Sequence, residues 1–139
     1  MSWAHNLSTA AATLYGGLCI ASALPFAGVH VSIPWVTPRR PPGNSQSWLA
    51  YYAEKNAWMA RLSGGRLTPR QAGYAGAALR VAVGACCIWG SRLVREAALL
   101  LNGAVVARGT VLAARDGRPM RPQWTMLGVI GLCLLLGRL

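Results

Sequence analysis

Arg80 is the residue whose position most needs a chemical explanation, because it interrupts an otherwise apolar run from residue 72 to residue 90. If that run crosses a bilayer as a helix, Arg80 lies close to the midplane, where a cation costs about 2.5–3.5 kcal/mol on insertion scales. We therefore expect Arg80 to face the interior of a helix bundle or a wet cavity. Two roles stay open for it: a hydrogen-bonding partner that holds helices together, and a catalytic anchor for a substrate or an oxyanion.

Polar and aromatic residues are expected near Arg80. A tight turn at Ser91 would place Asn102 opposite Arg80, since each lies eleven residues from the turn. Tyr15, in an apolar run at residues 7–29, is expected near the same depth. Asn102 and Tyr15, together with Trp58 from an aromatic segment between the two runs, are therefore the candidate substrate-binding residues.

The chain has only three acidic residues. Asp116 stands in an Asp-Gly turn among arginines, which is typical of a turn former, and it is also a candidate catalytic group. Glu54 belongs to the aromatic segment and can lie on a solvated face or pair with nearby cations. If that segment packs over the mouth of a bundle, Glu54 would close a cavity that contains Arg80 and would be a plausible general acid or base.

The third acid is best explained without catalysis. Glu96 stands beside Arg92 and Arg95 near an expected helix start, where an acid forms local ion pairs and suits the helix dipole. His5 and His30 flank the first apolar run at opposite ends, so they cannot act together.

Metal and cofactor chemistry lack their usual motifs. All four cysteines lie inside apolar runs, without a C-x-x-C motif or a histidine at metal-ligand spacing. The sequence also lacks a Gly-rich phosphate loop, G-x-S-x-G and H-E-x-x-H. We expect no metal site and no cofactor, and neither nucleotide use nor classical serine or zinc hydrolysis.

Composition places this chain in a membrane. It is 54% hydrophobic and 12% charged, against about 25% charged residues in soluble domains. The charge is lopsided, with 14 Lys and Arg against three Asp and Glu and a formal net charge of +11. The cations stand in the gaps between apolar runs, so the positive-inside rule explains them better than nucleic-acid binding. We expect a lipid bilayer as partner and no nucleic acid.

The expected fold is all-α: a single membrane domain, residues 1–139, with four transmembrane helices at about 7–29, 72–90, 93–114 and 124–139. The connector, residues 30–71, opens with the Pro-rich segment P-W-V-T-P-R-R-P-P-G, which is incompatible with regular structure. It continues into an amphipathic interfacial helix at about 47–62, with a serine N-cap and Gly64-Gly65 after its end.

Orientation follows from counting cations on the two sides of four crossings. Ten lie in or beside the connector and the third loop, and three lie on the other side. The connector and third loop are therefore expected in the cytoplasm, with both termini outside or lumenal. In a eukaryotic cell the membrane would be the endoplasmic reticulum or another internal membrane.

The stretch R-Q-A-G-Y-A-G-A-A-L-R-V-A-V-G-A-C-C-I-W-G, with its return helix and final apolar helix, resembles the DoxX-like small four-helix membrane proteins. The resemblance covers about the last half of the chain and the first span, and rests on small-residue patterning. In size and layout the chain more weakly resembles small multi-pass epoxide hydrolases of fungal polyketide clusters. That resemblance implies a lipophilic substrate and an epoxide opened by Glu54, Asp116 and Arg80.

Two hypotheses follow. The preferred one is a multi-pass membrane hydrolase that opens an epoxide in secondary-metabolite biosynthesis. The alternative is a non-catalytic, DoxX-like accessory subunit or scaffold of a membrane complex, which the few acids and the small-residue helix faces favour. A transporter formed by a homo-oligomer of short spans ranks third, since a midplane cation without a paired acid is a thin basis for proton coupling.

Overall fold

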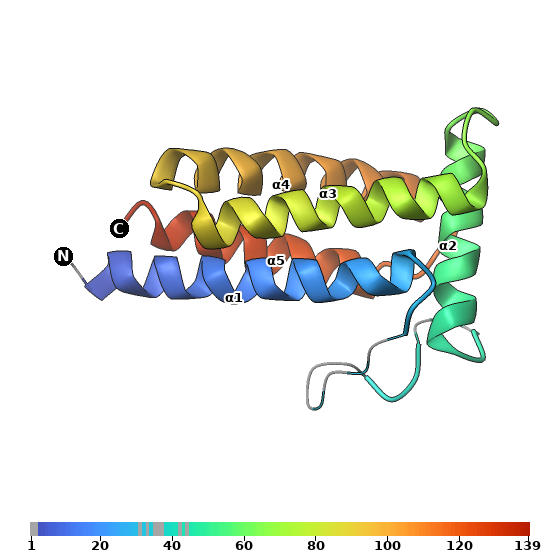
Figure 1. The fold of residues 1–139 in the computed structure, drawn as a ribbon, viewed down its shortest axis with the longest axis horizontal. Coiled ribbons are helices and arrows are strands. Elements are labelled where there is room, and N and C mark those ends of the chain that lie inside the picture. The colour runs from blue at the N-terminus through green and yellow to red at the C-terminus, as the bar shows by residue number, and fades with distance from the viewer. Residues whose placement is uncertain (1–2, 31, 33, 35–37, 42, 44) are drawn as a thin grey trace. The chain divides into compact units, whose positions relative to one another are not determined.

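The computed structural model describes residues 3–30, 32, 34, 38–41, 43 and 45–139, and the structured part of this chain is entirely α-helical. No strand occurs among the described residues, which confirms the all-α class. The described part of the Pro-rich segment is neither helix nor strand, and its residues 35–37 and 42 lie outside the described residues. The helices are α1 (Trp3–Phe26), α2 (Trp48–Leu62), α3 (Pro69–Trp89), α4 (Arg92–Arg115) and α5 (Arg121–Leu136) (Figure 1).

Three of the described helices, α1, α3 and α4, are long and apolar enough to cross a membrane. They have 24, 21 and 24 residues, and a helix needs about 20 to cross a hydrocarbon core of roughly 30 Å. The fourth expected span, α5, is apolar but has only 16 residues. The count of four crossings and the single membrane domain therefore stay predictions.

Local sequence explains where α2 and α4 begin. The hydroxyl of Ser47 accepts a hydrogen bond from the Ala50 amide at the start of α2, and Ser91 does the same for the Val94 amide at the start of α4. Each serine satisfies a backbone donor that has no partner within its helix. After α2 the chain turns through Gly64, whose φ of +69° suits a residue without a side chain.

The first helix begins earlier and ends earlier than the expected span at residues 7–29. It includes Trp3, His5 and Asn6 at its start, and Pro25 lies in its last turn. The chain leaves the helix through Gly28, which has a φ of +90°. The apolar run therefore located the helix correctly but not its ends, because hydropathy measures lipid preference and not backbone conformation.

The chain forms two compact units, and the boundary between them falls within α1 and within α3. Unit 1 comprises Met1–Leu18 and Val83–Leu139, and unit 2 comprises Cys19–Ala82. In unit 1, α4 packs against α5. The start of α1 meets the end of α3 closely at Gly16, where an added Cβ would lie 2.7 Å from the Gly84 carbonyl oxygen. Small residues thus permit a close helix approach, as is common in membrane proteins.

Unit 2 combines the last turns of α1, the whole of α2 and the first part of α3. In Figure 1 the axis of α2 runs across those of α1 and α3. The side-chain amide of Asn56 in α2 donates to the Phe26 carbonyl oxygen at the end of α1, at 3.1 Å. Gly73 of α3 lies beside this bond, and any side chain there would collide with the Phe26 carbonyl and with Asn56. The three helices therefore meet at the last turn of α1.

Candidate functional site

Charged and aromatic side chains of α2 and α3 converge on the ring of Phe26, the last residue of α1, within unit 2. The guanidinium carbon of Arg80 lies 4.5 Å from the ring centroid, and Lys55 Nζ lies 5.3 Å from it. The ring of Tyr52 meets Phe26 edge-on, with centroids 4.9 Å apart. We call these residues, with Ser22, the Phe26 cluster: Ser22, Phe26, Tyr52, Lys55 and Arg80.

The side chain of Arg80 reaches back toward the start of α3. Its Nη1 donates to the hydroxyl of Ser22 at 2.9 Å, so the guanidinium lies at the depth of the last two turns of α1. Side chains on a helix point toward its N-terminus, and long cationic side chains extend toward the nearer membrane surface. The backbone of Arg80 is near the middle of α3, as expected, but its charge is carried toward the connector.

Burial and charge act in opposite directions on Tyr52. The partial burial of its phenol raises the pKa of Tyr52 above the ordinary value of 10.0, and the nearby Arg80 cation lowers it, with burial the larger effect. Tyr52 is therefore a neutral phenol at physiological pH. The Arg80 charge therefore acts on a Tyr52 phenol that is partly removed from solvent.

Glu54, the predicted catalytic acid of α2, lies on a different side of this helix from Tyr52 and Lys55. Tyr51 and Trp58 are buried, Tyr52 and Lys55 are half-buried, and Glu54 is exposed. The groups of α2 that contact the Phe26 ring are thus Tyr52 and Lys55, which sequence reasoning did not select as site residues. The catalytic assignment of Glu54 stays a prediction.

Two of the predicted substrate-binding residues meet inside unit 1. Asn102 Nδ2 donates to the hydroxyl of Tyr15 at 2.6 Å, and each residue is only 4% exposed. This bond joins α1 to α4 across the core of the unit. We expected Asn102 and Arg80 to lie at the same depth. Asn102 belongs to unit 1 and Arg80 to unit 2, so this expectation stays a prediction.

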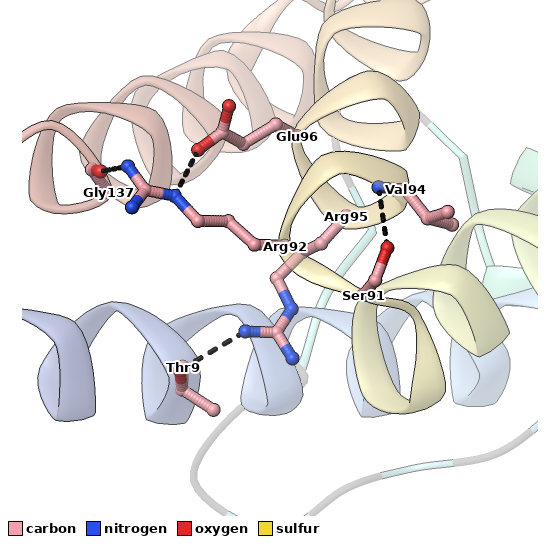
Figure 2. Close-up of polar contacts among 7 residues, drawn as sticks. All are labelled: Thr9, Ser91, Arg92, Val94, Arg95, Glu96 and Gly137. Carbon is pink, nitrogen blue, oxygen red and sulfur yellow. Dashed lines mark hydrogen bonds and ion pairs between the residues drawn. The ribbon is translucent and has the colours of Figure 1, made fainter.

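Glu96 forms the local ion pair that its position suggested. Arg92 Nε donates to Glu96 Oε1 at 3.0 Å, one helical turn apart, as Figure 2 shows. Arg92 also donates to the carbonyl oxygen of Gly137 at 2.7 Å, just after the end of α5. These contacts give Glu96 and Arg92 a structural explanation.

Arg95 connects three helices of unit 1 through hydrogen bonds to a backbone carbonyl group and a hydroxyl group. It donates from Nε to the carbonyl oxygen of Cys87 at 3.1 Å, and from Nη1 to the hydroxyl of Thr9 at 3.1 Å. Figure 2 shows the second bond, between the first turn of α4 and α1. The Cys87 carbonyl belongs to the last turn of α3, where carbonyl groups lack partners within their helix.

Asp116 directly follows α4 and is engaged by its neighbour. Arg115 Nε donates to Asp116 Oδ1 at 2.8 Å, and Gly117 adopts a φ of +68°. This is the geometry of a turn former. Asp116 belongs to unit 1, whereas Glu54 and Arg80 belong to unit 2, so their joint action in catalysis stays a prediction.

Searches of protein-family models, curated proteins and solved structures find no match to this chain. Among the described residues, no group of three or more His, Cys, Asp or Glu side chains is placed to hold a metal ion. The candidate site therefore rests on the chain's own residues, and within unit 2 these are the members of the Phe26 cluster.

Proposed function

We propose that this chain is a multi-pass membrane enzyme that acts on a lipophilic metabolite beside the Phe26 cluster. Its reaction would be the opening of an epoxide in secondary-metabolite biosynthesis. The observation that carries the proposal is the placement of the Arg80 guanidinium next to the Phe26 ring and Ser22, at one end of two apolar helices. A lipophilic substrate enters such a place from the bilayer, and a fixed cation there acts on its polar group.

Epoxide hydrolysis needs few groups. Water attacks one ring carbon, that carbon's bond to the epoxide oxygen breaks, and the oxygen takes a proton, giving a vicinal diol. Arg80 can donate hydrogen bonds to the oxygen as negative charge develops on it. Glu54 and Asp116 are the carboxyl groups proposed to take the proton from water and to return one to the oxygen. Asn102, Tyr15 and Trp58 are proposed to hold the substrate.

The proposed orientation follows the charge count. The connector and the third loop, which carry ten cations in or beside them, would face the cytoplasm. The exposed large apolar side chains on α1, α3, α4 and α5 suit contact with lipid, among them Leu14, Val81, Leu101 and Leu135. A helix that meets lipid needs no other cover for these side chains.

The test is turnover by membranes from cells that express the chain alone. Lipophilic epoxides are supplied and diol formation is measured for Glu54→Gln, Arg80→Gln, Asn102→Leu and Asp116→Asn. Loss of an oxyanion donor lowers turnover by about a hundredfold or more, and this is the result expected for Arg80→Gln. Arg61→Gln, an exposed cation of α2, is the matched control. Full retention of diol formation in all four variants would contradict the assigned site.

A second candidate function is that of a non-catalytic subunit of a membrane complex. It is favoured by α5, where Gly128 and Gly131 lie on the exposed face and an added Cβ at either position would meet nothing within 4 Å. Glycine on an exposed face allows close approach of another transmembrane helix. Stoichiometric partners in detergent extracts would favour this function. Turnover by the chain expressed alone in a foreign host would exclude it.

A further inference from the structure

Two cations from different helices contact the same aromatic ring in unit 2. Arg80 of α3 lies 4.5 Å from the centroid of the Phe26 ring, and Lys55 of α2 lies 5.3 Å from it. Lys55 also lies 5.9 Å from the ring centroid of Tyr51. The electron-rich faces of aromatic rings attract cations. Each ring contact holds a charge near Phe26 without cancelling it.

Unit 2 as a whole has a strong excess of positive charge. Glu54 is its one acidic residue in sequence, and its side chain is exposed. The seven cationic residues of the unit are Arg39, Arg40, Lys55, Arg61, Arg66, Arg70 and Arg80. Arg80 and Lys55 are half-buried, unlike the other five, which are exposed. The positive charge of the Phe26 cluster is thus the least solvated in the unit.

Partial burial strengthens electrostatic interactions at this place. Burial of the Tyr52 phenol raises its pKa, and Arg80 acts on the same phenol in the opposite direction. An anion near the cluster would feel both cations in a medium less polar than water, where Coulomb energies are several times larger than in bulk water.

Apolar surface adjoins the charges. Phe26, Tyr51 and Trp58 are buried aromatic residues of the same unit, and Phe26 is the last residue of the apolar helix α1. The exposed side chains of α1 and α3 near this end include Leu24 and Tyr74. A molecule with a polar end and an apolar chain would find partners for both at the end of α1.

We propose that the Phe26 cluster binds the anionic head group of a lipophilic ligand, with Arg80 and Lys55 as the cations that hold it and α1 and α3 in contact with its apolar chain. This proposal rests on the proposed function, because it names the class of the lipophilic metabolite. Carboxylate is the expected head group, since its two oxygens match the paired donors of a guanidinium. An anionic phospholipid carries the same chemistry and is the second source to be compared.

The probe is a dansyl-labelled fatty acid, and its methyl ester is the neutral control. Both are titrated into the full-length protein in nanodiscs of zwitterionic phosphatidylcholine, and dansyl fluorescence reports binding. The acid should bind at least about tenfold more tightly than the ester, because the ester lacks the charge that strengthens hydrogen bonds from the two cations. Equal affinity for acid and ester, or no binding of the acid, would overturn the proposal without the use of any variant.

Variants identify the cations. Arg80→Gln and Lys55→Gln should each lower the affinity for the acid about tenfold and leave that for the ester unchanged, whereas the exposed Arg61→Gln should change neither. If Arg80→Gln does not fold, Lys55→Gln decides the same point. Unchanged acid affinity in a folded Lys55→Gln variant would contradict the assignment of the site.

Two further comparisons distinguish the possible sources of the ligand, and distinguish the head-group proposal from the enzyme proposal. Displacement of the probe by phosphatidylglycerol in the nanodisc supports the anion site and assigns its natural occupant to the bilayer. Resistance to phosphatidylglycerol supports a carboxylate metabolite. If membranes open epoxides but the acid binds no better than the ester, the head-group proposal is wrong and the enzyme proposal stands. If the acid binds selectively but membranes do not open epoxides, the enzyme proposal is wrong and the head-group proposal stands.

Discussion

The guanidinium of Arg80 lies 4.5 Å over the ring of Phe26, the single phenylalanine of the chain. This contact joins the middle of α3 to the last residue of α1. Tyr52 and Lys55 of α2 reach the same ring. One aromatic side chain is therefore the common contact of three helices.

Replacement of Phe26 by leucine should destabilise unit 2. Leucine keeps most of the apolar volume but removes the edge-on contact with Tyr52 and the two cation contacts. An aromatic pair contributes about 0.5–1.5 kcal/mol and each exposed cation–π pair about 0.5–1 kcal/mol, so we expect a loss of about 1.5–3.5 kcal/mol. Denaturation in mixed micelles measures it. Leu24→Val, on the exposed side of α1, is the control and should change stability by less than about 0.5 kcal/mol.

Tyr52 should ionise above the ordinary phenol pKa of 10.0, because burial is the larger of the two effects on it. The difference in phenolate absorbance between the unaltered protein and Tyr52→Phe isolates this group. Arg80→Gln should raise the pKa of Tyr52 further, since the cation that favours phenolate is gone. A Tyr52 midpoint at or below 10 would contradict the assigned burial.

The raised pKa also fixes how stability depends on pH. The folded protein holds the Tyr52 proton more tightly than the unfolded chain does, so the contribution of this group is fully present below pH 10. It declines as the pH rises above 10 and through the pKa of the folded protein. Denaturation curves at several pH values should therefore show a steeper alkaline loss in the unaltered protein than in Tyr52→Phe.

Adjacent glycines in α1 should respond to alanine in opposite ways. A Cβ at Gly16 would lie 2.7 Å from the Gly84 carbonyl oxygen and 2.9 Å from Ile88, whereas one at Gly17 would meet nothing within 4 Å. Gly16→Ala should therefore push α1 and α3 apart and lower the denaturation midpoint. Gly17→Ala should leave it unchanged or raise it, since alanine favours a helix by up to about 1 kcal/mol. Equal effects of the two substitutions would contradict the packing of α1 against α3.

The buried bond between Asn102 and Tyr15 should give a measurable coupling energy. A double-mutant cycle with Tyr15→Phe and Asn102→Leu isolates the pair. Hydrogen bonds between membrane helices average about 0.6 kcal/mol and reach about 1.7 kcal/mol. At 2.6 Å between two residues that are each 4% exposed, we expect a value in the upper half of this range. A coupling energy of zero would contradict a stabilising role for this bond.

The proposed orientation is tested by labelling from each side of the membrane. In a cysteine-free background, the Arg66→Cys variant, altered in the connector, should react with an impermeant maleimide only in inside-out vesicles. The Arg138→Cys variant should react only in right-side-out vesicles if all four helices cross. Labelling of both positions from the same side would mean that α5 does not cross. Labelling of position 66 from outside would reverse the orientation.

Sequence patterns were most informative where a local cause operates. The start of α2 was expected at a serine N-cap, and Ser47 is that cap. The turn at Ser91 was expected to be tight, and α4 begins at the next residue. Hydropathy was less informative about helix ends, since α5 begins at Arg121, three residues before its expected start. Pro122 lies in its first turn, where the backbone amide hydrogen that proline lacks would have no partner within the helix.

The contacts of Arg80 were not predicted. Counting residues from the turn at Ser91 compares backbone depths, and it selected Asn102. The side chain of arginine is long, and it extends along its helix toward the N-terminus, so the charge reaches residues about one turn from the Arg80 backbone, here Ser22 and Phe26. A search for aromatic and hydroxyl residues at that depth would have found both. The contributions of Tyr52 and Lys55 depend on how α2 packs in unit 2, which no local pattern determines.

The bond from Arg95 to Thr9 has a consequence for biogenesis. Its two residues are 86 positions apart, so a ribosome has synthesised α1, α2 and α3 before the donor to Thr9 exists. The carbonyl oxygen of Cys87 also accepts a hydrogen bond from the Arg95 guanidinium, and this bond cannot form before Arg95 is synthesised. The first and third helices are therefore synthesised before the contact that joins them at this end can form, and α4 completes that contact.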